Sequence, residues 1–140
     1  MKLHYDCESY IVLHKYYYLE DSKMIVFVYR KCSTCMKALK WLDEHGISYE
    51  ERAIKEENPT YEELKKWYTK SELPLKKFFN TSGMLYKEMG LKDKLKDMSE
   101  DEQLKLLATD GMLVKRPLVI GDDFVLTGFR EKEWIEAMHV

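Results

Sequence analysis

A short apolar run, followed at once by a cysteine pair and a helix, limits the fold of this chain more than any other feature. Residues 24–29 read MIVFVY, a β-branched and aromatic run with the length of a strand buried on both faces. Ser33 or Thr34 can cap a helix through Ala38–Leu42, and residues 47–54 contain a second strand. This order predicts two parallel strands joined by a right-handed crossover.

The middle of the chain reads as helical. Thr60 with Glu63 and Ser99 with Glu102 are two capping-box patterns, each ahead of apolar residues at helical spacing. Short helical turns are expected between these two helices, together with an irregular segment in which Phe78–Phe79 anchors the core.

The C-terminal part returns to strands. Residues 117–120 and 124–127 are β-rich runs on either side of a Gly-Asp-Asp turn, which is a hairpin signal, and residues 131–138 close with a helix. The element order predicts one α/β domain over residues 24–140, with a helical insertion at about residues 58–112.

Residues 1–23 differ from the rest of the chain. They are rich in tyrosine, with three in a row at 16–18, and charged residues interrupt any run that could serve as a signal peptide. Two interpretations stay open. The segment is either an extension upstream of the domain, from a start codon assigned too early, or it supplies an extra strand or partner-binding arm at Tyr10–Leu19.

Charge and cysteine usage exclude several classes of protein. The 140 residues include 23 basic and 25 acidic side chains, a net charge of −2, which argues against direct nucleic-acid binding but does not exclude a protein partner. Apolar stretches are too short to span a membrane, so no membrane contact is expected. Three cysteines are too few for a disulfide framework, which predicts a cytoplasmic protein.

The chemistry is expected at Cys32 and Cys35. The turn from strand to helix places Cys32 at or just before the helix N-terminus, where unpaired N–H groups and the helix dipole stabilise a thiolate. The positive charges of the flanking Arg30 and Lys31 would also stabilise a thiolate at Cys32. Cys35 lies one helical turn deeper, within reach of the Cys32 sulfur, and can resolve a mixed disulfide.

The cysteine pair has two other interpretations. In the first, the C-x-x-C pair supplies two of the four ligands of a structural zinc site. The remaining candidates, Cys7 and four histidines, have no paired spacing, so no metal is expected. Two inert buried cysteines are less consistent with this spacing at a helix N-terminus. Cys7 stands alone and is interpreted as incidental.

Arg116-Pro117 is the second informative site. A proline that opens a strand is allowed at its first residue, and a cis bond there would be a specific feature of the fold. Arg116 and Arg130 lie near predicted strand ends, where they could converge on an anion, although a surface charge is the default for each.

The chain resembles the ArsC/Spx family of arsenate-reductase-like proteins from Met24 to about Val140. Three stretches carry the likeness: YRKCSTCMKALKWLDEHGISYEER, FFNTSGMLYKEMGL and KRPLVIGDDFVLTGFREKEW. The combination of C-x-x-C, N-T-S-G and R-P at these distances is specific. The resemblance implies a thioredoxin-like fold, with a mixed four-stranded sheet and a helical insertion between its βαβ and ββα halves.

The resemblance also implies roles for individual residues. Cys32 matches the family's nucleophile and Cys35 the second cysteine of its redox-active members. Arg116 matches an arginine beside the active site, Pro117 a cis proline, and Arg130 an arginine that binds the oxyanion in arsenate reductases. The expected substrate-binding set comprises these last three residues together with Thr34 and Asn80.

Two departures separate the chain from arsenate reductases coupled to glutaredoxin. Those enzymes carry a serine where Cys35 stands and an arginine at about the position of Asn80. We therefore expect a thiol-disulfide oxidoreductase, with an Spx-like redox-sensing regulator or an arsenate reductase as alternatives. The expected reductant is glutathione, another small thiol or a thioredoxin- or glutaredoxin-type protein, with no other cofactor. The regulator would bind the C-terminal domain of the RNA polymerase α subunit.

Overall fold

The computed structural model describes residues 23–140, and its centre is one mixed sheet. Its order is β2–β1–β3–β4, in which β1 is parallel to β2 and antiparallel to β3, and β3 is antiparallel to β4. The strands are β1 (Ile25–Val28), β2 (Glu50–Ala53), β3 (Leu118–Ile120) and β4 (Val125–Thr127). The predicted mixed four-stranded sheet, its parallel crossover and its C-terminal hairpin are confirmed.

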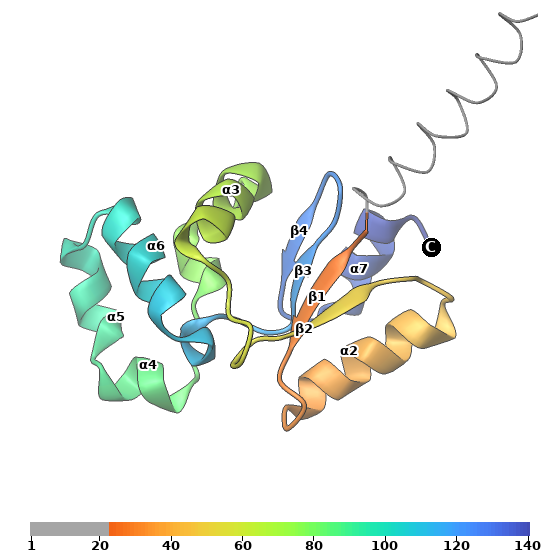
Figure 1. Ribbon diagram of the computed structural model, residues 1–140, viewed down its shortest axis with the longest axis horizontal. Helices are drawn as coiled ribbons and strands as arrows, with labels where there is room; N and C mark the ends of the chain where they lie inside the picture. The colour runs from red at the N-terminus through yellow and green to blue at the C-terminus, as the bar shows by residue number, and fades with distance from the viewer. Residues whose placement is uncertain (1–22) are drawn as a thin grey trace, which may run out of the picture.

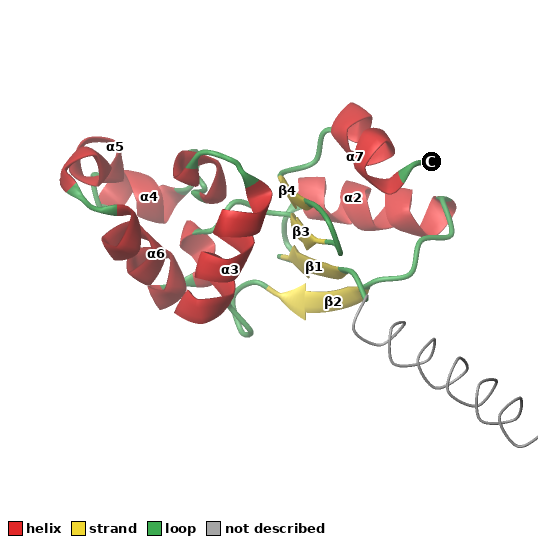
Figure 2. Ribbon diagram, turned by 90° about the horizontal axis from the view of Figure 1, so that it is seen from above, coloured by secondary structure: helices red, strands yellow, loops and turns green. Residues whose placement is uncertain are grey.

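Helices cover both faces of this sheet (Figures 1 and 2). Helices α2 (Ser33–Glu44) and α7 (Glu131–Met138) lie on one face. The other face carries the helices between β2 and β3, which are α3 (Tyr61–Ser71), α4 (Met84–Glu88), α5 (Leu91–Lys94) and α6 (Glu100–Thr109). Three short 3₁₀ helices complete this part of the chain: η1 (Leu75–Phe78), η2 (Leu95–Asp97) and η3 (Gly111–Leu113).

The alternation of side chains along β1 divides the apolar core into two layers. Val26 and Val28 pack with α2 and α7, whereas Phe27 faces the helical insertion and meets the ring of Trp67 edge-on at 5.5 Å. All three side chains are buried because the strand lies inside the sheet with helices on both sides. The uninterrupted apolar run in the sequence therefore corresponds to a strand buried on both faces.

Helix α2 begins one residue earlier than the sequence predicted. The Cys32 N–H donates to the Tyr29 carbonyl at 2.8 Å, and the Met36 N–H donates to the Cys32 carbonyl at 3.1 Å. Cys32 is therefore the N-cap, and the expected caps Ser33 and Thr34 already lie inside the helix. The tight turn after β1 leaves no room for a longer loop, so the cysteine itself occupies the helix N-terminus.

The two capping boxes have different outcomes. Thr60 accepts from the Glu63 N–H while the Glu63 carboxylate accepts from the Thr60 N–H, so this box is complete. At α6 the Ser99 hydroxyl accepts from the Glu102 N–H at 3.1 Å, and that hydroxyl lies 3.0 Å from the Glu102 carboxylate. The second box is only half formed, because the carboxylate meets the hydroxyl instead of the backbone N–H.

Two segments far apart in the sequence lie side by side next to the sheet. The Asn80 N–H donates to the Leu113 carbonyl and the Lys115 N–H to the Phe78 carbonyl, each at 2.8 Å. Phe78 and Phe79 are fully buried, which confirms them as core anchors. This pairing brings the residues after Phe79 next to the residues that precede β3.

The predictions for residues 1–22, including Cys7 and the Tyr10–Leu19 arm, lie outside the described residues. Within residues 23–140, no helix is both long enough and apolar enough to cross a membrane.

We expect Gly111→Ala to destabilise the domain by about 2–3 kcal/mol. A Cβ at this position would overlap the backbone carbonyl of Ile54, which cannot move without disturbing the connection after β2. Gly46→Ala is the control, because a Cβ there meets open space and only its φ of +64° is strained. That change should cost about 1 kcal/mol. Urea unfolding measures both; equal losses would contradict the steric argument.

Candidate functional site

A groove of about 1190 Å³ runs between the N-terminus of α2, the segment around and after η1, the residues just before β3, strand β4 and helix α7. It brings together five residues that the sequence places far apart. They are Cys32, Thr34, Asn80, Arg116 and Arg130. The other two predicted site residues, Cys35 and Pro117, are buried. The candidate site thus depends on tertiary contacts between three parts of the chain.

Cys32 has the environment of a reactive thiol. Its side chain is half-buried at the N-terminus of α2 and lines the groove. Burial by itself would raise the pKa of Cys32, but the N–H and thiol of Cys35 and the guanidinium of Arg116 outweigh it. The N–H of Thr34 adds to this effect, and the net result is a pKa below the ordinary thiol value.

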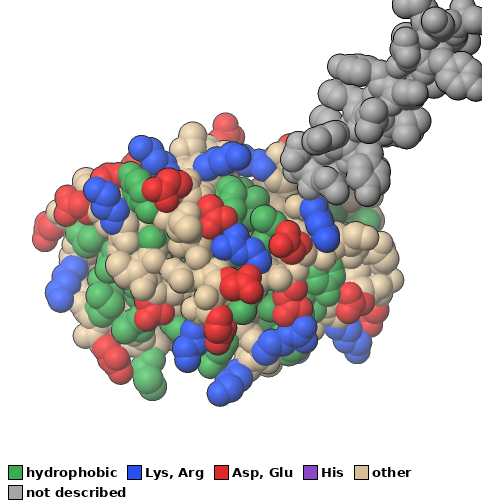
Figure 3. All heavy atoms as spheres, in the orientation of Figure 1, with side chains coloured by type: hydrophobic (Ala, Val, Ile, Leu, Met, Phe, Trp, Pro, Cys, Tyr) green, Lys and Arg blue, Asp and Glu red, His purple; other side chains and the backbone are tan. Residues whose placement is uncertain are grey.

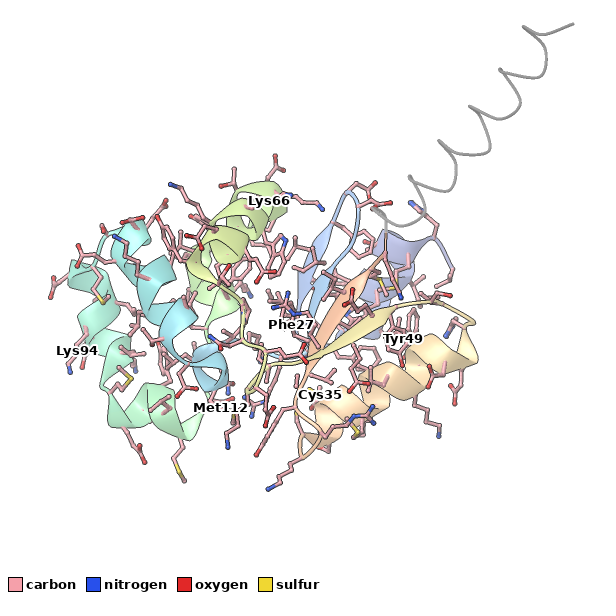
Figure 4. The ribbon with its side chains drawn as sticks, in the orientation of Figure 1. Phe27, Cys35, Tyr49, Lys66, Lys94 and Met112 are labelled. Atoms are coloured by element: carbon pink, nitrogen blue, oxygen red, sulfur yellow. The ribbon has the colours of Figure 1, made fainter. Side chains whose placement is uncertain are left out.

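Cys35 has the opposite properties. It is fully buried between the start of α2 and the sheet (Figure 4), and its pKa is raised to about 12. Burial is the main cause, and the neighbouring Cys32 raises the pKa further. Both cysteines are free thiols in this structure. The pair therefore consists of one accessible, acidic thiol and one buried thiol that stays protonated.

Arg116 presents unpaired donors beside the cysteine. Its Nε and Nη1 atoms are buried and have no hydrogen-bond partner among residues 23–140. Its guanidinium carbon lies 5.1 Å from the centre of the Tyr29 ring. The Arg116–Pro117 peptide bond is cis, as the resemblance implied. Free guanidinium donors next to a thiolate can stabilise that thiolate or an anionic group of a substrate.

Asn80 forms one wall of the groove through a tight turn. It is 8% exposed, and its carbonyl accepts from the Gly83 N–H at 3.0 Å. A Cβ on Gly83 would lie 2.6 Å from the Asn80 amide nitrogen, which accounts for glycine at the end of the N-T-S-G stretch. The turn holds a neutral amide beside the groove.

Arg130 and Thr34 occupy the outer part of the groove. The Arg130 side chain is 73% exposed and lies 3.7 Å from the Glu133 carboxylate, and Thr34 is also exposed. The two predicted arginines therefore line one groove in different settings: Arg116 is half-buried, with Nε and Nη1 atoms that have no partner among residues 23–140, and Arg130 is paired at the surface.

Sequence reasoning missed Tyr29 and the lysines of the groove. Lys76, Lys77 and Lys115 line it, and Tyr29 lies under Arg116. No local pattern marks these residues as functional, because basic and acidic side chains are also interspersed elsewhere, as on the face drawn in Figure 3. Within residues 23–140, no three His, Cys, Asp or Glu side chains are grouped to hold a metal ion.

Comparisons with known proteins identify relatives of this chain. The protein-family model that is described as the ArsC family matches residues 27–137 of this chain. The chain is 59% identical over 108 residues to the uncharacterized protein YusI of Bacillus subtilis, covering 77% of this chain and 92% of that protein. It is 26% identical over 110 residues to the global transcriptional regulator Spx 2 of Bacillus cereus, covering 79% and 82%.

A solved structure is also similar. The crystal structure of a putative ArsC family related protein from Bacteroides fragilis superposes with a TM-score of 0.79 at 56% identity. The match covers 81% of this chain and 96% of that one.

We expect Arg116→Met to slow alkylation of Cys32 by iodoacetamide at pH 7 by about three- to tenfold. Loss of the guanidinium raises the pKa of Cys32, so less thiolate is present at any pH below it. Arg130→Met is the matched control, because that side chain is exposed and paired with Glu133. Mass spectrometry of the tryptic peptide 32–37 follows the reaction. An equal effect of both substitutions would contradict a specific role of Arg116.

Proposed function

The chain belongs to the ArsC family, and from this membership we propose that it is a thiol-disulfide oxidoreductase that uses Cys32 and Cys35. The observation that carries the proposal is the contrast between the two thiols. Cys32 lies in the groove with a lowered pKa, and Cys35 is buried behind it with a pKa of about 12. A nucleophile and a resolving thiol need this division of properties.

The first step is attack by the Cys32 thiolate on a substrate disulfide. A bond forms between the Cys32 sulfur and one substrate sulfur, the substrate disulfide breaks, and the other sulfur leaves as a thiolate. The lowered pKa increases the fraction of Cys32 that is present as thiolate. The free donors of Arg116 stabilise the thiolate before attack or an anionic group of the bound substrate.

The second step depends on a change in Cys35. Cys32 raises the pKa of Cys35 in two ways, through the hydrogen bond between the two sulfurs and through the negative charge of the Cys32 thiolate. Once Cys32 is in a mixed disulfide, that charge is gone and the pKa of Cys35 falls. Cys35 then gives up its proton and attacks the Cys32 sulfur, the bond between Cys32 and the substrate sulfur breaks, and the departing sulfur takes up the proton and leaves as a thiol. A Cys32–Cys35 disulfide remains.

An external thiol must return the enzyme to its reduced form. Two electrons are needed, and we propose that glutathione, another small thiol or a thioredoxin- or glutaredoxin-type protein supplies them by the same exchange. The cycle uses no metal or organic cofactor. A reducing thiol pool is typical of the cytoplasm, where we place the protein.

We expect Cys32→Ser to reduce disulfide reductase activity to background and Cys35→Ser to trap the mixed disulfide. Trapping adds the mass of one substrate thiol to the intact protein, read by mass spectrometry after incubation with small mixed disulfides. Cys7→Ser is the matched control and should keep full activity. Retained activity in Cys32→Ser would contradict the proposal, as would absence of any adduct in Cys35→Ser.

A redox-sensing regulator is the second candidate, and the similarity to Spx 2 supports it. In this case the Cys32–Cys35 disulfide would change a protein-binding surface. We expect the oxidised chain to retain the C-terminal domain of the RNA polymerase α subunit at least about fivefold more than the reduced chain in a pull-down. Cys35→Ser, which cannot form the disulfide, should not respond to oxidation. Equal retention in both redox states would contradict regulation.

Arsenate reduction is the weakest candidate. A buried neutral amide, Asn80, stands where arsenate reductases of this family carry an arginine, and Arg130 is engaged with Glu133. A neutral amide at this position cannot supply the bidentate, charge-assisted hydrogen bonds that a guanidinium offers a doubly charged oxyanion. Arsenate belongs among the substrates in the same reductase assays.

A further inference from the structure

An arginine that lies over an aromatic ring connects the end of β1 to the start of β3. Tyr29 follows β1 directly, is half-buried and packs against the core on the insertion side of the sheet. The Arg116 guanidinium lies over its ring, 5.1 Å from the ring centre. A cation over an aromatic face is attracted by the ring quadrupole, and a planar guanidinium can also stack on it.

This way of holding an arginine differs from that used elsewhere in the molecule. Arg52 also lies over a ring, that of Phe27 at 4.4 Å, but the Glu63 carboxylate accepts a hydrogen bond from it at 2.7 Å. In residues 23–140, the Nε and Nη1 atoms of Arg116 have no such partner. A carboxylate would restrain Arg116 equally well, but it would occupy the donors and neutralise the charge that a thiolate needs. An aromatic ring restrains the guanidinium plane and leaves its edge free.

The same tyrosine contacts the nucleophile. The Tyr29 carbonyl accepts a hydrogen bond from the Cys32 N–H at 2.8 Å. The backbone of Tyr29 therefore places Cys32, and its side chain lies under Arg116. One residue sets the position of the cysteine relative to the guanidinium.

We propose that Tyr29 is a positioning residue, whose ring holds the Arg116 guanidinium beside Cys32 with its donors free. Tyr29 does not act on the substrate. Its effect on Cys32 passes through Arg116, and this inference deepens the proposed oxidoreductase function, on which it rests. Its test does not need turnover, because the reactivity of Cys32 reports the position of the arginine directly.

The experiment measures the rate of Cys32 alkylation by iodoacetamide against pH in the full chain, followed on the tryptic peptide 32–37. Tyr29→Leu is expected to lower the rate at pH 7 by about three- to tenfold and to move the pH profile to higher pH. Tyr29→Phe keeps the ring and should stay within about twofold of the unmodified protein. An unchanged profile in a folded Tyr29→Leu protein would overturn the proposal.

Tyr61 offers a matched control. It is also half-buried, packs against the same core and has a cation over its ring, Lys105 at 5.6 Å. Tyr61→Leu should cost similar stability and leave the alkylation profile unchanged. If both leucine substitutions slow alkylation equally, Tyr29 supports the fold and does not position Arg116.

A double-mutant cycle with Arg116→Met tests the route of the effect. Tyr29→Leu should have no further effect on the alkylation profile when Met replaces Arg116. An equal effect in both backgrounds would mean that Tyr29 acts through the backbone turn at Cys32, which overturns the proposal. Reductase activity of the unmodified protein is measured separately, so failure of the positioning role is distinguishable from failure of the oxidoreductase function.

Fluorinated phenylalanines at position 29 keep the test valid if Tyr29→Leu does not fold. Fluorination weakens the negative face of the ring with little change in shape, so Cys32 alkylation should slow step by step with each added fluorine. An alkylation rate that stays constant across the fluorinated series would mean that the ring only fills space.

Discussion

The hydrogen bond from the Cys32 N–H to the Tyr29 carbonyl is the contact on which the site depends. It closes the turn between β1 and α2 at 2.8 Å, which makes Cys32 the residue that caps the helix. One turn later, helical geometry places Cys35 between the helix and the sheet, where it is fully buried. The different properties of the two thiols therefore follow from one tight turn.

The second half of the site is delivered by a different kind of contact. Hydrogen bonds between residues 78–80 and residues 113–115 bring the end of the helical insertion next to the start of β3. Asn80 and Arg116 reach the groove through this pairing. The insertion thus does more than cover one face of the sheet, because its last part completes the site that β1 and α2 begin.

Much of the fold follows from local patterns in the sequence. The apolar run of β1, the Thr60–Glu63 capping box and the Gly-Asp-Asp hairpin each appear where they were predicted. Local patterns were less accurate at helix N-termini. Ser33 and Thr34 are good caps by residue type, but the length of the preceding turn selected Cys32. At Ser99 a competing contact between side chains left the box half formed.

The sequence by itself determined the βαβ order, the cysteine pair at a helix N-terminus and the position of the proline before β3, because these depend on residues close together in the chain. Only the tertiary structure decided which arginine presents free hydrogen-bond donors beside Cys32. Arg116 and Arg130 are indistinguishable as lone arginines, yet in the described part of the chain Arg116 has two buried donor atoms without a partner, whereas Arg130 is paired at the surface. The role of Tyr29 likewise became visible only when packing placed the Arg116 guanidinium over its ring. Burial and partner geometry arise from contacts across the whole chain, and no local pattern encodes them.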